Sequence, residues 1–311
     1  MSSHRLTWLL AILLSSTAPA SAQEPSKGSS RWGPDDEKGA INLITPSKVL
    51  ESVKLIQKGV VYPLGRAYEE GMPLASGRHF TLLIPQAAPP AGKNRIVGHE
   101  EFVATHLGQV GTALDGLGHV GIGDVFYNGF HRKEFVTPKG LTHLGIENVG
   151  VFLTRGVLLD IASLKRKSRL EKGYEITEQD LKEALKQQQL NIRPGDVVLI
   201  HTGWGSLWLA DNELFSGGEP GLGMGAAQFL VQRQVVLVGS DNWGIDVVPQ
   251  SDPELIHPVH QLFLTQNGIY LLENLDTGVL AREKVHEFAF FFAPLRIKGA
   301  TGSPGNPVAI R

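Results

Sequence analysis

Short apolar runs, separated by turn-forming residues, recur along the chain and predict a structure rich in strands. Six of these runs have the length and apolar content of buried strands: 149–155, 156–161, 197–202, 235–239, 268–273 and 288–297. The last run is aromatic and is broken by Pro294. One run reaches His201 and another ends at Glu273, and polar side chains at the ends of strands are positions where functional sites are commonly built.

Helical spacing is limited to two segments. Thr177 can act as a helix N-cap, with acidic residues in the favourable first turn, and apolar residues then recur at intervals of three and four from Leu181. Residues 225–232 fit a second helix. Many strands and few helices predict a mixed α/β fold.

The N-terminus has the order of regions of a secretory signal peptide. His4 and Arg5 form a short basic start, the apolar run 6–14 follows, and small residues end at Ala22. We expect cleavage after Ala22 and a periplasmic or secreted bacterial protein; a buried N-terminal helix is the alternative. Because the apolar run is too short to span a bilayer, no membrane attachment is expected after cleavage.

The rest of the chain is predicted to form one domain. Residues 1–22 are the signal peptide, and residues 23–34, rich in Ser, Gly and Pro, predict a flexible lead-in. Residues 35–311 then contain no internal repeat and no long low-complexity linker that would divide them.

Composition and charge exclude several classes of protein. The 311 residues include 29 Lys and Arg against 31 Asp and Glu, a formal net charge of −2, so no basic excess indicates a nucleic-acid partner. The chain has no Cys, which excludes disulfides, thiolate metal sites and a Cys nucleophile. A small molecule is the expected partner, and any metal site must be built from His, Asp and Glu.

A glycine-rich stretch, residues 105–120, contains Asp115 and His119. Glycines let the backbone approach a ligand closely, and a carboxylate beside an imidazole suits a divalent metal or a general base with its orienting partner. The alternative is an Asp that caps a turn and a His that satisfies backbone carbonyls.

A second group of polar residues favours the metal interpretation. His257 and His260 precede Glu273, a carboxylate at the end of an apolar strand. Burying such a carboxylate costs free energy unless it is paired or binds a cation. Asp115, His260 and Glu273 are therefore candidate metal ligands.

With these residues in place, the sequence resembles the putative cyclase family, which includes bacterial kynurenine formamidases and isatin hydrolases. The hallmark of that family is His-x-Gly-Thr-His-x-Asp-x-Pro-x-His, and Gly111-Thr112, Asp115 and His119 match it here. The resemblance continues through three further segments: 194–204, 257–274 and 298–307. It therefore extends from about Trp32 to the end of the chain.

The resemblance implies a fold, a reaction and a set of roles. The fold is the swivelling β/β/α architecture, and the reaction is metal-dependent hydrolysis of an amide or lactam, as in the arylformamidases that form kynurenine during tryptophan catabolism. Asp115, His260 and Glu273 would bind zinc or manganese, and His119 would act in acid/base catalysis. Relatives tend to assemble as homodimers or homotetramers.

The sequence departs from the hallmark at three positions. Gln109 stands where the family has its first His, Ala113 where it has its second, and Leu117 where it has Pro. Since Ala offers no donor atom and two imidazoles are lost, the remaining ligands would favour Mn or Mg over Zn. His106 or His201 are possible extra ligands.

Aromatic residues near these motifs are candidates to contact a planar substrate. Trp204, Trp243 and Phe126 are the candidates, together with Gln109 as a polar contact; the alternative for each aromatic residue is a place in the core. The main rival to a hydrolase is a non-catalytic periplasmic relative that binds a small molecule and has lost the metal site. Metal content after purification would discriminate between the two.

Overall fold

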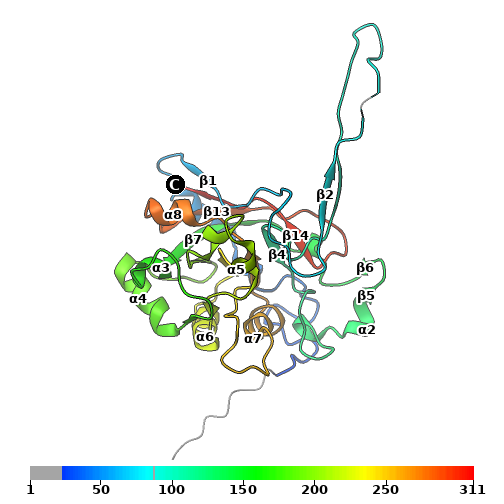
Figure 1. Cartoon of the computed structure of the whole chain (residues 1–311). Helices are drawn as coiled ribbons and strands as arrows, with labels where there is room; N and C mark the ends of the chain where they lie inside the picture. The colour runs from blue at the N-terminus through cyan, green and yellow to red at the C-terminus, as the bar shows by residue number, and fades with distance from the viewer. Residues whose placement is uncertain (1–22, 87) are drawn as a thin grey trace, which may run out of the picture.

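The computed structural model describes residues 23–86 and 88–311. The predicted signal peptide lies outside the described residues. A nine-stranded sheet forms the centre of the molecule (Figure 1). Its strands, in order across the sheet, are β1 (Val61–Pro63), β15 (Val308–Ile310), β13 (Glu287–Phe292), β7 (Phe152–Asp160), β9 (Val197–His201), β11 (Leu237–Ser240), β12 (Tyr270–Glu273), β4 (Ala113–Asp115) and β14 (Gly302–Pro304).

The sheet is mixed. Strands β7, β9, β11 and β12 run parallel to their neighbours in this central group, whereas β13, β15 and β1 on one side and β4 and β14 on the other pair antiparallel. Helices connect the parallel strands, as parallel pairing requires. The mixed α/β class predicted from the apolar runs is confirmed.

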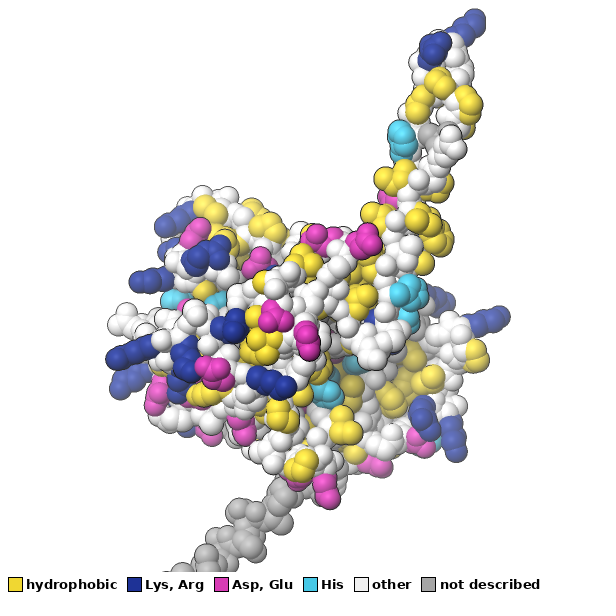
Figure 2. Space-filling model, in the orientation of Figure 1, with side chains coloured by type: hydrophobic (Ala, Val, Ile, Leu, Met, Phe, Trp, Pro, Cys, Tyr) yellow, Lys and Arg dark blue, Asp and Glu magenta, His cyan; other side chains and the backbone are white. Residues whose placement is uncertain are grey.

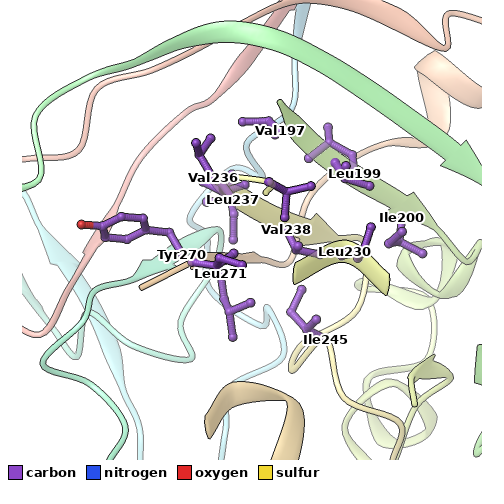
Figure 3. Close-up of a cluster of buried hydrophobic side chains, with 14 of the residues drawn as sticks. Val197, Leu199, Ile200, Leu230, Val236, Leu237, Val238, Ile245, Tyr270 and Leu271 are labelled. Carbon is purple, nitrogen blue, oxygen red and sulfur yellow. The ribbon is translucent and has the colours of Figure 1, made fainter. Parts of the chain in front are cut away.

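The parallel strands form the core. Val197, Leu199, Leu237 and Val238 are completely buried, and Leu271 on β12 packs in the same cluster (Figure 3). Strands covered on both faces have continuous apolar sequences rather than alternating ones, which is why these runs could be recognised from sequence.

One predicted pair of strands is a single strand. The runs 149–155 and 156–161 were expected to be separate, but β7 passes straight through Gly156. A Cβ atom at this position would lie 2.2 Å from the ring of Phe288 on β13, so the glycine permits close packing of two neighbouring strands and does not mark a turn.

The two predicted helices are present. Helix α4 (Glu178–Gln188) begins with a capping box, in which the Thr177 side chain accepts from the Asp180 amide and the Asp180 carboxylate accepts from the Thr177 amide. Helix α6 (Met224–Gln232) packs beside α4. The remaining α-helices are short: α1 (Pro46–Val53), α2 (Arg132–Phe135), α3 (Ile161–Leu164), α5 (Asn212–Ser216), α7 (Pro258–His260) and α8 (Gly278–Arg282).

Three two-stranded sheets complete the described structure: β2 (Phe80–Leu83) with β3 (Phe102–Thr105), β5 (Val136–Thr137) with β6 (Gly140–Leu141), and β8 (Glu175–Ile176) with β10 (Gly221–Leu222). The first of these belongs to a long hairpin that projects away from the rest of the molecule (Figure 1).

Part of the N-terminal lead-in lies against the body. The amides of Gly28 and Ser30 donate to the backbone carbonyl and the side chain of Asn128, at 3.0 and 2.8 Å. The boundary predicted between residues 34 and 35 stays a prediction. In the described part of the chain, no helix combines the length and the apolar character that crossing a bilayer requires.

Candidate metal and active site

Neighbouring strands place Asp115 and Glu273 on one face of the sheet. β4 and β12 pair antiparallel with Glu273 opposite Ala113 and Leu271 opposite Asp115. Opposed residues point to the same side of a sheet, and side chains alternate along a strand. Ala113, Asp115 and Glu273 therefore share a face at the end of β12.

His260 completes a buried group of three. It is the last residue of α7, where the chain continues into a π-helix over Gln261–Gln266. Its Nε2 atom lies 3.6 Å from Asp115 Oδ2 and 3.4 Å from Glu273 Oε1. One potential ligand atom from each of the three side chains lies within 4.8 Å of the others, and all three residues are buried.

Asp246 orients the imidazole of His260. Its Oδ2 atom lies 2.6 Å from His260 Nδ1, and the same carboxylate accepts the backbone amides of Val259 and His260. In the neutral imidazole, this contact places the proton on Nδ1, so that the lone pair of Nε2 faces Asp115 and Glu273. A carboxylate behind a histidine in this way is typical of metal-binding imidazoles.

His119 lies at the rim of this group. Its Nε2 atom is 3.8 Å from Asp115 Oδ1, and its side chain is 28% exposed, in contrast to the buried Asp115. The turn between them needs glycine at position 116, because a Cβ atom there would lie 2.8 Å from the backbone oxygen of Thr301. His119 therefore reaches both the buried group and solvent.

Burial and neighbouring charges shift the pKa values of all three residues in this group. Burial would raise the pKa of Asp115, but the charges of His119 and His260 lower it below its usual value. Burial and the charge of Asp115 raise the pKa of Glu273 to about 8. Burial lowers the pKa of His260, but its contacts with Asp115, Asp246 and Glu273 raise it well above the usual value.

Two of the carboxylate oxygens fit a cation. Asp115 Oδ2 and Glu273 Oε1 are buried and have no hydrogen-bond partner. Such atoms are rare in folded proteins and indicate a missing partner. Because both oxygens face Nε2 of His260, two carboxylates and one imidazole are available to a divalent ion, a ligand set that suits Mn, Mg or Zn.

The two departures from the hallmark flank this group. The side-chain amide of Gln109 donates to Glu273 Oε2, so Gln109 does reach the predicted site. Ala113 is 1% exposed and lies directly across from Glu273. Its methyl group offers no donor, and the described residues place neither His106 nor His201 in this group of ligands.

A cavity of about 400 Å³ opens beside the site. Its lining is Pro73, Leu74, Ala75, Ser76, Gln109, Phe215, Ser216, Trp243 and Asn274. Gln109 and Asn274 connect it to Glu273, since one binds that carboxylate and the other follows it in sequence. The walls are mainly apolar with a few polar groups, as in pockets for small organic ligands.

Four residues that were candidates for substrate contact or metal binding lie outside both the ligand group and the cavity lining. Trp204 is 1% exposed and donates its indole N–H to the Phe215 carbonyl, so it belongs to the core and not to the cavity wall. Phe126 packs edge-on against Phe135. The two remaining residues are His106, which packs edge-on against His79, and His201, whose Nδ1 is 2.7 Å from Thr277 Oγ1.

Sequence reasoning missed the buried carboxyl group of Glu219. It is completely buried and accepts the Trp243 amide at 2.7 Å, and burial raises its pKa well above the usual value. Nothing in the local sequence marks a Glu before Pro220 as buried. The role of Asp246 has no local signal either, because its contact with His260 depends on the tertiary fold.

The mixed sheet and the buried group of Asp115, His260 and Glu273 place this chain among the α/β proteins that have a potential metal-binding site. The family model described as "Putative cyclase" matches residues 41–247, about two thirds of the sequence. The chain therefore belongs to the putative cyclase family, and the resemblance noted from its motifs is confirmed. His260 and Glu273 lie beyond the matched range.

Solved structures confirm the cyclase fold. A protein described as a novel cyclase is 31% identical, with a TM-score of 0.84, and the match covers 93% of this chain and 98% of that one. Isatin hydrolase A from Ralstonia solanacearum is 20% identical, with a TM-score of 0.63, covering 86% and 98%. Isatin hydrolase A from Labrenzia aggregata, bound to benzyl benzoate, is 19% identical, with a TM-score of 0.61, covering 80% and 93%. No curated protein matches the sequence.

Proposed function

We propose that this protein is a metal-dependent hydrolase that opens an amide, lactam or related C–N or C–O bond in a small aromatic substrate. One observation carries the proposal: Asp115, His260 and Glu273 come together from separate parts of the chain. Two of their buried carboxylate oxygens have no hydrogen-bond partner. The proposal is supported by similarity to isatin hydrolases, whose name states a substrate of this class.

Asp115, Glu273 and His260 would hold the ion, and we propose manganese rather than zinc. Oxygen ligands outnumber nitrogen here, and the imidazoles expected at positions 109 and 113 are absent. A bound divalent ion polarises a carbonyl group and lowers the pKa of water. Glu273 would bind it as the carboxylate, and Asp246 would keep Nε2 of His260 free for coordination.

His119 is the proposed proton carrier. Its imidazole can take a proton from the attacking water at Nε2, and Asp115 Oδ1, 3.8 Å away, would stabilise the imidazolium. As water oxygen bonds to the carbonyl carbon, the C–N bond breaks and His119 returns the proton to the leaving nitrogen. Partial exposure suits this role, because the ring can reach both substrate and solvent.

The cavity supports an aromatic substrate. Trp243 and Phe215 provide flat apolar walls, and Gln109 and Asn274 provide amide groups next to the metal ligands. Its volume of about 400 Å³ lies within the range of pockets that bind small organic molecules. We further propose that N-formylkynurenine is a substrate, which would give the protein a role in tryptophan catabolism.

Metal analysis combined with kinetics tests the proposal. Purified protein should contain about one equivalent of a divalent metal per chain, and it should hydrolyse isatin or N-formylkynurenine. Asp115→Asn should abolish turnover and strongly reduce metal content, whereas the exposed control Asp252→Asn should change neither. Full turnover by Asp115→Asn, or by protein stripped of metal, would exclude this mechanism.

A non-catalytic binding protein is the second candidate. The observation that favours it is the hydrogen bond that Gln109 donates to Glu273. This bond gives the carboxylate a partner within the protein, so that it depends less on a bound ion. A metal-free protein that binds isatin by calorimetry without turnover would support this alternative.

We also propose that the protein is exported. The basic, apolar and small-residue order of residues 1–22 supports this location. N-terminal sequencing of protein from a periplasmic fraction should begin at Gln23, and an intact N-terminus in the cytoplasmic fraction alone would contradict export.

A further inference from the structure

A second cavity lies at the same edge of the sheet as the first cavity, which adjoins the proposed metal site. Its volume is about 410 Å³, and the two linings share no residue. Its walls include segments that follow β9, β11 and β12. Because these strands are parallel, their carboxyl ends lie at one edge, where α/β sheets commonly bind ligands. Trp208 lines the second cavity and packs edge-on against Phe215, which lines the first.

Arg66 brings a partly buried positive charge to the second cavity. Its Nη2 atom donates to the backbone carbonyls of Gly205 and Leu275, at 3.0 and 3.2 Å, and its Nε atom is buried without a hydrogen-bond partner. Burial lowers the pKa of Arg66 below its usual value, and the charges of Asp276 and Asp241 offset this effect only in part. A negatively charged group of a ligand would therefore complement this guanidinium.

The loop after β9 leaves room for this arginine. A Cβ atom on Gly205 would collide with Arg66 Nη2 and would lie 3.0 Å from the Cβ atom of Asp241. The carboxylate of Asp241 accepts the amide and the hydroxyl of Thr202, at 2.9 and 2.6 Å, and the amide of Gly205 at 3.3 Å. Asp241 therefore holds the loop in place, and Asp276 is the carboxylate of this cavity that is left for a ligand.

Two exposed residues of opposite charge, Asp276 and Arg282, form the rim of the second cavity. They flank helix α8, because Asp276 precedes its N-cap and Arg282 is its last residue. A Cβ atom on Gly278 would lie 3.4 Å from Asp276 Oδ1 and 3.3 Å from Arg282 Nη1. Both charged groups therefore approach the same glycine, and the cavity offers two guanidinium groups and one carboxylate to a ligand.

These local groups select the charge of the ligand. Acidic and basic side chains are interspersed over the face of the body that Figure 2 shows, and the formal net charge is −2, so the surface as a whole favours neither sign. A simple anion would be repelled by Asp276, and a simple amine would be repelled by both arginines. A zwitterion has a partner of opposite charge for each of its ends.

We propose that the second cavity binds an α-amino acid in its zwitterionic form. Its carboxylate would bind Arg66 and Arg282, its ammonium group would bind Asp276, and Trp208 would provide an apolar wall for its side chain. The volume lies within the range of pockets for small organic molecules. The proposal does not depend on the hydrolase assignment, because the two cavities have separate linings and are tested by separate measurements.

Ligand binding tests the proposal directly. Thermal unfolding with each of the twenty common L-amino acids at about 10 mM should identify at least one that stabilises the wild-type protein, and calorimetry should then give its Kd. The corresponding amine, which lacks the carboxylate, and the corresponding acid, which lacks the ammonium group, should each bind at least about tenfold more weakly. Binding of none of the twenty, or equally tight binding of the acid, would overturn the proposal.

Variants at the rim locate the bound amino acid. Asp276→Asn and Arg282→Gln should each raise its Kd about tenfold, and both positions are exposed, so the fold should tolerate the changes. Asp276→Asn should also remove the preference for the amino acid over the corresponding acid. Asp252→Asn and Arg296→Gln are matched controls at exposed positions outside the cavity lining, and they should leave the Kd unchanged.

Trp243→Ala distinguishes the second cavity from the first. This change removes a wall of the first cavity and should leave the Kd of the amino acid unchanged. A loss of affinity as large as that of Asp276→Asn, or full affinity in both rim variants, would show that the amino acid binds elsewhere and would overturn the proposal. Failure of the protein to hydrolyse isatin or N-formylkynurenine would contradict the hydrolase assignment alone.

Discussion

Asp246 Oδ2 and His260 Nδ1 are 2.6 Å apart inside the protein, and this contact directs the opposite ring nitrogen of His260 toward Asp115 and Glu273. Asp246 is itself held by the backbone amides of Val259 and His260, which begin the segment that carries the imidazole. Orientation of the proposed ligand is therefore built into the local fold.

Asp246→Asn should weaken metal binding without removing a ligand. The amide keeps the shape of the side chain but loses the charge that fixes the tautomer and raises the basicity of His260, and losses of this type are about 10- to 100-fold in affinity. Calorimetric titration of metal-free protein with Mn²⁺ measures the effect. Asp252→Asn, on the exposed surface, is the control; equal affinities would remove Asp246 from its proposed role.

Metal affinity should increase as the pH rises from 6 to 9. Burial and the charge of Asp115 raise the pKa of Glu273 to about 8, so below this pH the metal-free protein holds the proton that the ion must displace. Titrations at several pH values measure the trend. An affinity that is constant over this range would show that Glu273 does not bind the ion.

The metal-free protein should lose stability over the same range. Because the pKa values of Glu273 and His260 are raised in the folded state, this state binds more protons than the unfolded chain between the two sets of values, and its stability falls as the pH rises toward and through about 8. Thermal unfolding with a chelator should show this decline, and saturating Mn²⁺ should reduce it.

Ala113→His should tighten metal binding and increase the preference for zinc. The new imidazole would project from the face shared with Asp115 and Glu273, directly across from the latter. We expect a gain of about tenfold, or 1.4 kcal/mol. Competition with a chelator measures the gain, and Ala113→Leu supplies similar bulk without a donor; an equal response from both variants would contradict the expectation.

Trp243→Ala should raise KM for an aromatic substrate about threefold to tenfold while metal content stays constant. The ring lines the cavity but is not part of the ligand group, and aromatic contacts of this kind contribute about 0.5–1.5 kcal/mol. Phe291→Ala, on the exposed side of β13, is the control. An unchanged KM would place the substrate outside this cavity.

Thr177→Ala should destabilise the protein by about 1 kcal/mol, the usual effect of losing a helix N-cap. Its side chain accepts the Asp180 amide at 3.2 Å at the start of α4. Chemical denaturation measures the loss, with the exposed Gln179→Ala as control. Metal affinity should not change, since α4 contributes no residue to the ligand group.

Much of this structure was predictable because the relevant signals are local. Continuous apolar runs identified the buried parallel strands, and a carboxylate at the end of such a run singled out Glu273. Asp115 and His260 were candidate metal ligands because of their residue types, and the fold brings them together with Glu273.

The errors concern properties that only packing decides. Gly156 was interpreted as a break between strands, whereas it fits beneath the ring of Phe288. Trp204 was a candidate for substrate contact because it is aromatic, but it lies in the core. The sequence around Glu219 gives no sign that this residue is buried. Each depends on segments distant in sequence, which a single local pattern does not specify.

Strand β14, the edge strand beyond β4, ties the proposed ligand group to a distant part of the sequence. Gly302 pairs with Asp115 itself, on the side of β4 that faces away from β12. Pairing between segments so far apart along a chain forms slowly during folding. We therefore expect Asp115 to reach its final place only when both flanking strands have joined the sheet, so that metal binding would report on completed folding.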